Sequence, residues 1–353
     1  MQNSIWLYRL FDIAEEINLE KVEKILVQNK PTTRMRLARI KPKSMQFKNP
    51  PVTVELDGGK VDLPQGTFPT VIIAKIYDLG VVSITQRILL SPNMAYEDIK
   101  GLAIHLNNTE ELEASFSNYL QLIRNSLSPA LVKESYQAFM EDFTIYYFRD
   151  WQKDWDAVPL LLAEPEPVSP QMRKETLNNS YTYGLGDLTI ITWDSALVYD
   201  INGSTDIPDL LEFAVSQLLE LRYYDSLLSQ EMEKMYDAIE AAETQFRRLN
   251  NYRRIMNQIM ELVVDISEIT ERIQNSLKVT EDVFYARVYS GALTIFRTKE
   301  WMENIQHKIS VIQRSYTMLS EEITTRRSMW LEVAIIFLFI LEIVLNFTPL
   351  LHK

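Results

Sequence analysis

The sequence predicts an α+β protein whose second half is helical. A mixed α+β domain is expected over residues 1–205, and a long antiparallel helical hairpin or coiled coil over 206–328. One transmembrane helix is expected over 329–348, and a short tail over 349–353. Three observations predict this order: short β-rich runs in the first half, a heptad pattern in the second half, and an apolar run near the end.

The first half contains several short runs of β-branched and aromatic residues that are separated by turn signals. Residues 77–80 (Tyr-Asp-Leu-Gly) form such a signal between two apolar runs, so 71–84 is predicted to be a β-hairpin. Helical patterns lie between the runs, and Ser128-Pro129 divides the last of them into two helices; the patterns cover residues 14–28, 95–106 and 109–140. This mixture of hairpins and helices predicts the α+β class.

The second half carries an almost unbroken helical pattern after Pro208. Apolar residues recur at alternating spacings of three and four over 211–263, and again over 301–323 after a turn. Such a heptad series predicts two long helices with one stripe facing a partner helix, either in the same chain or in another subunit. Asp225 and Arg253 interrupt the first series. We expect them to fix the register or select the partner at some cost in stability.

The apolar run near the end predicts a membrane anchor. About twenty helical residues span the roughly 30 Å hydrocarbon layer, and residues 329–347 are mostly Leu, Ile, Val and Phe. Arg326 and Arg327 precede the run and favour a cytoplasmic location for the N-terminal side. No secretory signal is expected at the N-terminus. These features predict a single-pass protein of the cytoplasmic (inner) membrane, in contact with lipids, with most of the chain in the cytoplasm.

Two glutamates lie in this run. Glu332 lies close to the expected membrane interface, where it can reach water or pair with Arg327. Glu342 lies deeper and needs either protonation or a partner within the membrane. Two readings stay open for Glu342: a hydrogen bond between the helices of an oligomer, which we favour, or proton or ion handling.

A basic segment stands out against the acidic chain, which has 36 Lys and Arg, 48 Asp and Glu, and a net charge of −12. No Asp or Glu occurs between residues 31 and 48, and the segment contains Arg34, Arg36, Arg39, Lys41, Lys43 and Lys48. These residues form a possible anion-binding patch for the phosphates of nucleic acid or of anionic lipids. The alternative is a solvated loop that balances acidic neighbours.

Residues that catalysis and metal binding commonly use are scarce in this chain. The chain has no cysteine, and its three histidines, His105, His307 and His352, have no ligand-like spacing. No nucleophile elbow, phosphate-binding loop or kinase motif is present. We therefore predict no catalytic, cofactor-binding or metal-binding residues, no cofactor, and no enzymatic activity.

The tail has a pattern that is known from a protein family. An arginine at Arg327, then Leu331-Glu332, an aliphatic run at 334–336 and a second glutamate at Glu342 resemble the C-terminal signature of the "required for meiotic nuclear division" (RMD/YagE-like) family. Residues 77–82 resemble the hairpin of that family's N-terminal part, whereas 193–199 and 217–222 depart from it. The resemblance implies an oligomeric, membrane-anchored protein, with mitochondrial relatives linked to translation at the inner membrane, and it brings no catalytic residue.

These observations predict a non-enzymatic, membrane-anchored, homo-oligomeric scaffold with a cytoplasmic α+β domain. Two alternatives remain. The first is an adaptor that binds nucleic acid, the ribosome or another protein and supports translation at the membrane, based on residues 31–48. The second is a proton- or ion-coupled membrane element, based on Glu342.

Overall fold

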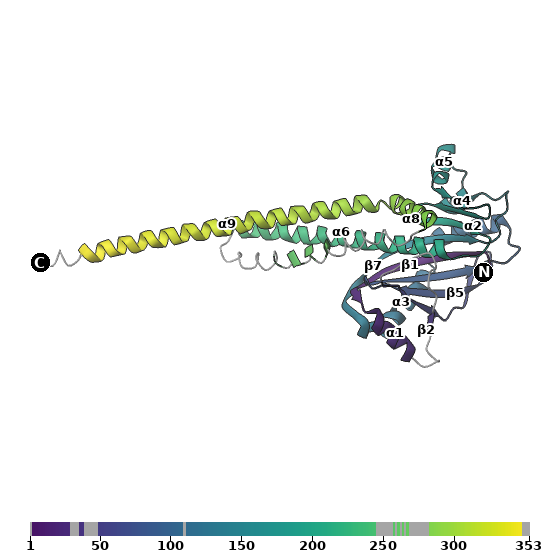
Figure 1. Cartoon of the computed structure of the whole chain (residues 1–353), viewed down its shortest axis with the longest axis horizontal. Helices are drawn as coiled ribbons and strands as arrows, with labels where there is room; N and C mark the ends of the chain where they lie inside the picture. Colours follow the sequence, from purple (N-terminus) through teal and green to yellow (C-terminus); the bar gives the residue numbers. More distant parts are fainter. Residues whose placement is uncertain are drawn as a thin grey trace. The chain divides into compact units, whose positions relative to one another are not determined.

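A computed structural model of the chain describes most of its residues. The described residues are 2–28, 35–38, 49–108, 111–244 and 282–347, with single positions or pairs between 257 and 267. They divide into an α+β unit, formed by Met1–Tyr224 and Thr270–Met302, and a helical unit, formed by Asp225–Ile269 and Glu303–Lys353. Helix α6 (Asp206–Thr244) contributes to both units. Figure 1 shows the elements of each unit.

The α+β unit is built on one large sheet. Its strands follow the spatial order β2-β3-β5-β6-β1-β7-β10-β9-β8, and β4 pairs with β5 outside this path. All pairs are antiparallel except β7 with β10. The strands are β1 (Ser4–Ile17), β2 (Met35–Ala38), β3 (Val52–Leu56), β4 (Lys60–Leu63), β5 (Gly66–Ile76), β6 (Val81–Leu89), β7 (Leu131–Phe148), β8 (Ser180–Tyr181), β9 (Asp187–Ile191) and β10 (Ser195–Asp200).

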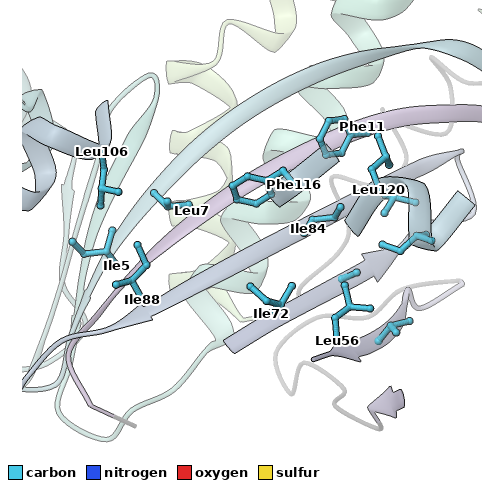
Figure 2. Packing of buried hydrophobic residues seen from close by; sticks show 14 of the residues in the cluster. Ile5, Leu7, Phe11, Leu56, Ile72, Ile84, Ile88, Leu106, Phe116 and Leu120 are labelled. Atoms are coloured by element: carbon cyan, nitrogen blue, oxygen red, sulfur yellow. The ribbon is translucent and has the colours of Figure 1, made fainter. Parts of the chain in front are cut away.

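Helices cover both faces of this sheet. The odd-numbered side chains of β1, such as Ile5 and Leu7, pack in a cluster with α2, α3 and α4, and Figure 2 shows part of this cluster. The even-numbered side chains of β1, such as Trp6 and Tyr8, pack in a second cluster with the first part of α6 and with α8. The helices of the unit are α1 (Leu19–Gln28), α2 (Tyr96–Asn108), α3 (Glu113–Leu127), α4 (Ala157–Leu162), α5 (Pro170–Asn178) and α8 (Val283–Ile295). A two-sided core follows from the alternation of side chains along each strand.

The predicted hairpin over 71–84 is confirmed, because β5 and β6 pair in antiparallel register from Thr70–Ile88 to Ile76–Val82. Gly80 makes the turn possible. Its φ of +95° favours glycine, and an added Cβ would lie 1.7 Å from the Ala14 carbonyl oxygen. The α+β class is also confirmed.

The helical pattern over 109–140 is only partly a helix. α3 ends at Leu127, Ser128–Ala130 form a single 3₁₀ turn, and the chain then enters β7. The predicted second helix is therefore wrong. β7 hydrogen-bonds to β1 on one side and to β10 on the other, and these non-local pairs override the local helical pattern.

In the helical unit, α6 and α9 (Thr298–Phe347) lie side by side where Lys308 contacts Asp225 and Ser229. Each helix buries apolar residues seven positions apart, Leu228 and Met235 on α6, and Ile305 and Ile312 on α9. The two helices run in the same direction (Figure 1). α6 and α9 are therefore parallel and do not form the expected antiparallel hairpin. More than fifty residues lie between them in the sequence.

The expected transmembrane helix over 329–348 is not supported. Among the residues that the structure describes, none belongs to a helix that is both long enough and apolar enough to cross a bilayer. Glu332 and Glu342 place two carboxyl groups within the expected span, and a charged group in the hydrocarbon layer is costly. The single-pass inner-membrane location, which depended on this helix, is corrected with it, whereas contact with lipids stays an untested prediction.

Candidate functional site

The C-terminal part of α9 exposes a long apolar surface. Between residues 331 and 343, all ten large apolar side chains are between 44% and 64% exposed. We call this segment the apolar end of α9. Glu332 and Glu342 are the charged residues within it, and both are exposed. A helix that is apolar on every side is normally buried, so this segment is a candidate contact surface.

A polar contact joins the two helices at the other end of the helical unit. The Lys308 Nζ atom donates to the Asp225 carboxylate at 2.6 Å, to the Asp225 carbonyl at 2.9 Å and to the Ser229 hydroxyl at 2.6 Å. Three acceptors for one ammonium fix the position of α9 along α6 at this level. Asp225 was expected to fix a register, and this contact is consistent with that role, which stays a prediction.

A buried ionic cluster lies between the sheet and the first part of α6. The Lys75 Nζ atom on β5 contacts Asp209 and Glu212 on α6, each at 2.6 Å, and all three side chains are less than 10% exposed. Burial lowers the pKa of Lys75, but the two carboxylates outweigh burial and raise it. The ammonium therefore stays charged and holds α6 on the sheet.

Two further carboxyl groups are buried beneath the same helix. Asp12 lies on β1 where the register with β7 shifts, and Glu220 lies on α6. Burial raises the pKa of Asp12 to about 7, and burial together with the nearby Asp12 charge raises the pKa of Glu220. Glu220 Oε1 has no hydrogen-bond partner among the described residues. Burial therefore shifts both carboxyl groups toward their protonated forms.

A third ionisable contact lies nearby. The Arg222 guanidinium on α6 donates to the Glu141 carboxylate on β7. Burial raises the pKa of Glu141 to about 7 even though Arg222 opposes this change. Arg222 and Glu141 join α6 to β7, so this contact supports a structural role in seating the helix.

The remaining predicted residues fall in different places. Arg36 lies on β2 opposite Glu55 of β3. Arg326 and Arg327 lie on α9, but their side chains are outside the described part of the structure. Six predicted residues lie outside the described residues. Five belong to the basic segment, namely Arg34, Arg39, Lys41, Lys43 and Lys48, and the sixth is Arg253, which was expected to fix the helix register. The anion-binding patch therefore stays a prediction.

Sequence reasoning missed the partners of the buried charges. Lys75 interrupts the apolar run of β5, and a lysine in a buried strand is itself a signal that a carboxylate lies opposite. Asp209 and Glu212 lie 134 and 137 positions away, so the sequence gives no direct sign of this pairing. In the described residues, no group of three or more His, Asp or Glu side chains is arranged to hold a metal ion.

These features define a class of protein: an α+β domain with one large sheet, followed by long helices. The chain belongs to the family described as "Uncharacterized protein MJ0711, N-terminal domain", whose model matches residues 2–205. The matched region ends directly before α6. A similar protein, "Uncharacterized protein MJ0711" of Methanocaldococcus jannaschii, is 27% identical over 227 residues, which cover 61% of this chain and 68% of the relative. No solved structure matches the chain.

The resemblance to the RMD/YagE-like family is therefore wrong. The matching family model is a different one and rests on the α+β domain rather than on the tail. The tail signature consisted of two glutamates and an arginine around an aliphatic run, a composition that unrelated apolar helices share. The link to translation at a membrane falls with the resemblance.

Proposed function

We propose that the protein is a non-enzymatic, self-associating scaffold, in which the apolar end of α9 binds the same segment of other copies. The observation that carries this proposal is the exposure of ten large apolar side chains between residues 331 and 343. The α+β domain is then the part that the assembly presents to other molecules.

The size of the exposed surface supports a stable contact. Burying one aliphatic or phenylalanine side chain is worth about 1.5–3 kcal/mol, which at about 25 cal/mol per Å² corresponds to roughly 60–120 Å² of apolar area. Ten such side chains at the observed exposures give about 500 Å² per chain. A standard protein interface buries about 800 Å² per partner, of which somewhat more than half is apolar. The apolar end of α9 is therefore large enough to form such an interface by itself.

A second copy is the occupant that fits this surface best. The exposed residues surround the helix, so several neighbouring helices are needed to cover them, and identical copies supply such helices in a closed symmetric bundle. Only Glu332 and Glu342 bring charge into the segment. Their repulsion is small compared with the burial of ten apolar side chains, worth on the order of 10 kcal/mol per chain before the cost of association.

Sedimentation equilibrium on the full chain tests the proposal. The test variant replaces four apolar residues with glutamine, which preserves helix propensity: Val333→Gln, Ile336→Gln, Phe337→Gln and Ile340→Gln. We expect the wild type to sediment as an oligomer at micromolar concentration and the variant as a monomer.

The matched control removes the same number of exposed apolar side chains from the α+β unit: Val27→Gln, Val132→Gln, Met172→Gln and Leu177→Gln. This control is expected to keep the mass of the wild type. A wild type that is monomeric throughout, or a loss of mass in the control alone, overturns the proposal. Circular dichroism confirms that each variant keeps its helix content.

A further inference from the structure

The loop between β8 and β9 is held in one conformation by a single carboxylate. Asp187 accepts hydrogen bonds from the backbone nitrogens of Tyr183 at 2.6 Å and Gly184 at 2.5 Å. The Gly186 carbonyl accepts from the backbone nitrogen of Ile201 at 3.1 Å, which ties the loop to the turn after β10. Both ends of the loop are therefore fixed, and its side chains are presented without a large cost in ordering.

This rigid loop displays apolar side chains to solvent. Leu185 is fully exposed at 108% and Tyr183 is 81% exposed. Ile201 beside the loop and Val283 at the start of α8 are also exposed, and the Tyr183 ring lies 5.4 Å from the ring of Phe284. We call Tyr183, Leu185, Ile201 and Val283 the apolar tip. Rigid aromatic and aliphatic side chains of this kind are typical anchors of protein interfaces.

The apolar tip has an acidic rim. Four aspartate carboxylates accept hydrogen bonds from backbone or side-chain groups in or next to the apolar tip: Asp187, Asp200, Asp206 and Asp282. Two guanidiniums lie among them, Arg287, which donates to the Thr182 carbonyl, and Arg149, which donates to the Ile201 carbonyl. Among the described residues, these four negative and two positive groups sum to a net charge of −2. The surface therefore attracts positive charge.

We propose that the apolar tip binds a basic polypeptide segment of another protein, which places an apolar side chain against Leu185 and lysine or arginine side chains at the acidic rim. A second copy is a poor occupant, because the chain carries a net charge of −12 and two acidic rims would face each other. Nucleic acid is disfavoured by the same charge. This contact is independent of the apolar end of α9.

Fluorescence anisotropy on the full chain tests the proposal. The probe is a fluorescein-labelled 16-residue peptide of alternating lysine and leucine pairs, and its counterpart carries glutamate in place of lysine. We expect the lysine peptide to bind the wild type, and Tyr183→Ser/Leu185→Ser to weaken this binding roughly tenfold, as for removal of a central anchor. Binding is also expected to weaken at high salt.

The control is Met172→Ser/Leu177→Ser, which removes exposed apolar side chains from α5 and is expected to bind like the wild type. The proposal is overturned if the tip variant and the control bind the lysine peptide equally, or if the glutamate peptide binds as well as the lysine peptide. A change in sedimentation mass on Tyr183→Ser/Leu185→Ser identifies a second copy as the occupant and also overturns it. Because the tip residues are exposed, unchanged thermal unfolding is expected for both variants.

Discussion

The α+β unit and the helical unit treat their apolar residues in opposite ways. In the α+β unit, apolar side chains on both faces of the sheet are covered by helices, and the buried Lys75 ammonium is paired with Asp209 and Glu212. In the helical unit, α6 and α9 bury residues near Asp225, but the apolar end of α9 is exposed throughout. The first unit has a two-sided interior of its own, whereas the second carries the long exposed apolar surface that we propose a second copy covers.

The largest expected effect tests whether the interior of the α+β unit depends on its buried charges. Lys75→Met leaves Asp209 and Glu212 buried without a cation, which is expected to lower the free energy of unfolding by about 3–5 kcal/mol. Urea denaturation measures the change. The triple variant Lys75→Met/Asp209→Asn/Glu212→Gln removes all three charges and is expected to recover part of the loss. A loss below about 1 kcal/mol for Lys75→Met would contradict this view of the cluster.

The next effect concerns the turn that joins β5 and β6. Gly80→Ala adds a Cβ that would lie 1.7 Å from the Ala14 carbonyl oxygen, at a φ of +95°. We expect a loss of about 2–4 kcal/mol in unfolding free energy. Gly59→Ala is the matched control, since nothing lies within 4 Å of its added Cβ, and its effect is expected to stay within about 0.5 kcal/mol. Equal effects at the two glycines would show that the close approach at Gly80 is absent.

A smaller effect is the contribution of Asp12 to the pH dependence of the unfolding free energy. Burial raises the pKa of Asp12 to about 7, whereas an unfolded aspartate titrates near 3.9. The folded protein therefore keeps a proton that the unfolded chain loses, so stability falls as pH rises from about 4 to about 7 and is level above that. Glu220 beside it has a raised pKa and acts in the same direction, while Arg124 opposes the effect on Asp12.

Asp12→Asn removes this contribution. Relative to the wild type, the variant is expected to gain about 1–3 kcal/mol in unfolding free energy at pH 8 compared with pH 5. Urea denaturation at both pH values measures the difference, and Asp142→Asn, at an exposed position of β7, serves as the control. An Asp12→Asn variant that follows the pH dependence of the wild type would show that Asp12 is ionised in the folded protein at pH 5.

The smallest effect concerns the contact between α6 and α9. A double-mutant cycle of Asp225→Asn and Lys308→Met is expected to give a coupling free energy of about 0.5–1 kcal/mol, because the pair is only partly buried. Thermal unfolding of the four proteins supplies the values. A coupling free energy of zero would mean that this contact does not fix the two helices against each other.

The sequence predicted the features that depend on local patterns. The strands around 71–84 could be recognised because β-branched runs and the Tyr77–Gly80 turn are adjacent in the chain. The helical pattern before Pro129 was also correct, but residues 131–140, the first part of β7, were wrongly assigned to a helix because their pairing with β1 joins residues more than a hundred positions apart. A local pattern carries no record of such pairs.

The candidate surfaces were harder to predict for a related reason. The heptad series indicated that α6 and α9 have apolar stripes, yet it did not indicate that the two helices run in the same direction (Figure 1). The apolar run after Met329 was visible, but hydropathy alone does not distinguish a bilayer from a helical bundle as its surroundings. The acidic rim of the apolar tip comes from four separate segments, so only the folded chain brings it together.

The absence of cysteine from the chain allows a direct test of self-association through the apolar end of α9. Ile336→Cys introduces a single thiol near the middle of this segment, where parallel and antiparallel bundles both bring copies together, and Lys21→Cys on α1 is the exposed control. After mild oxidation at micromolar concentration, non-reducing electrophoresis is expected to show a disulfide-linked dimer for Ile336→Cys and monomer for Lys21→Cys. Monomer for Ile336→Cys, or equal dimer at both positions, would contradict the scaffold account.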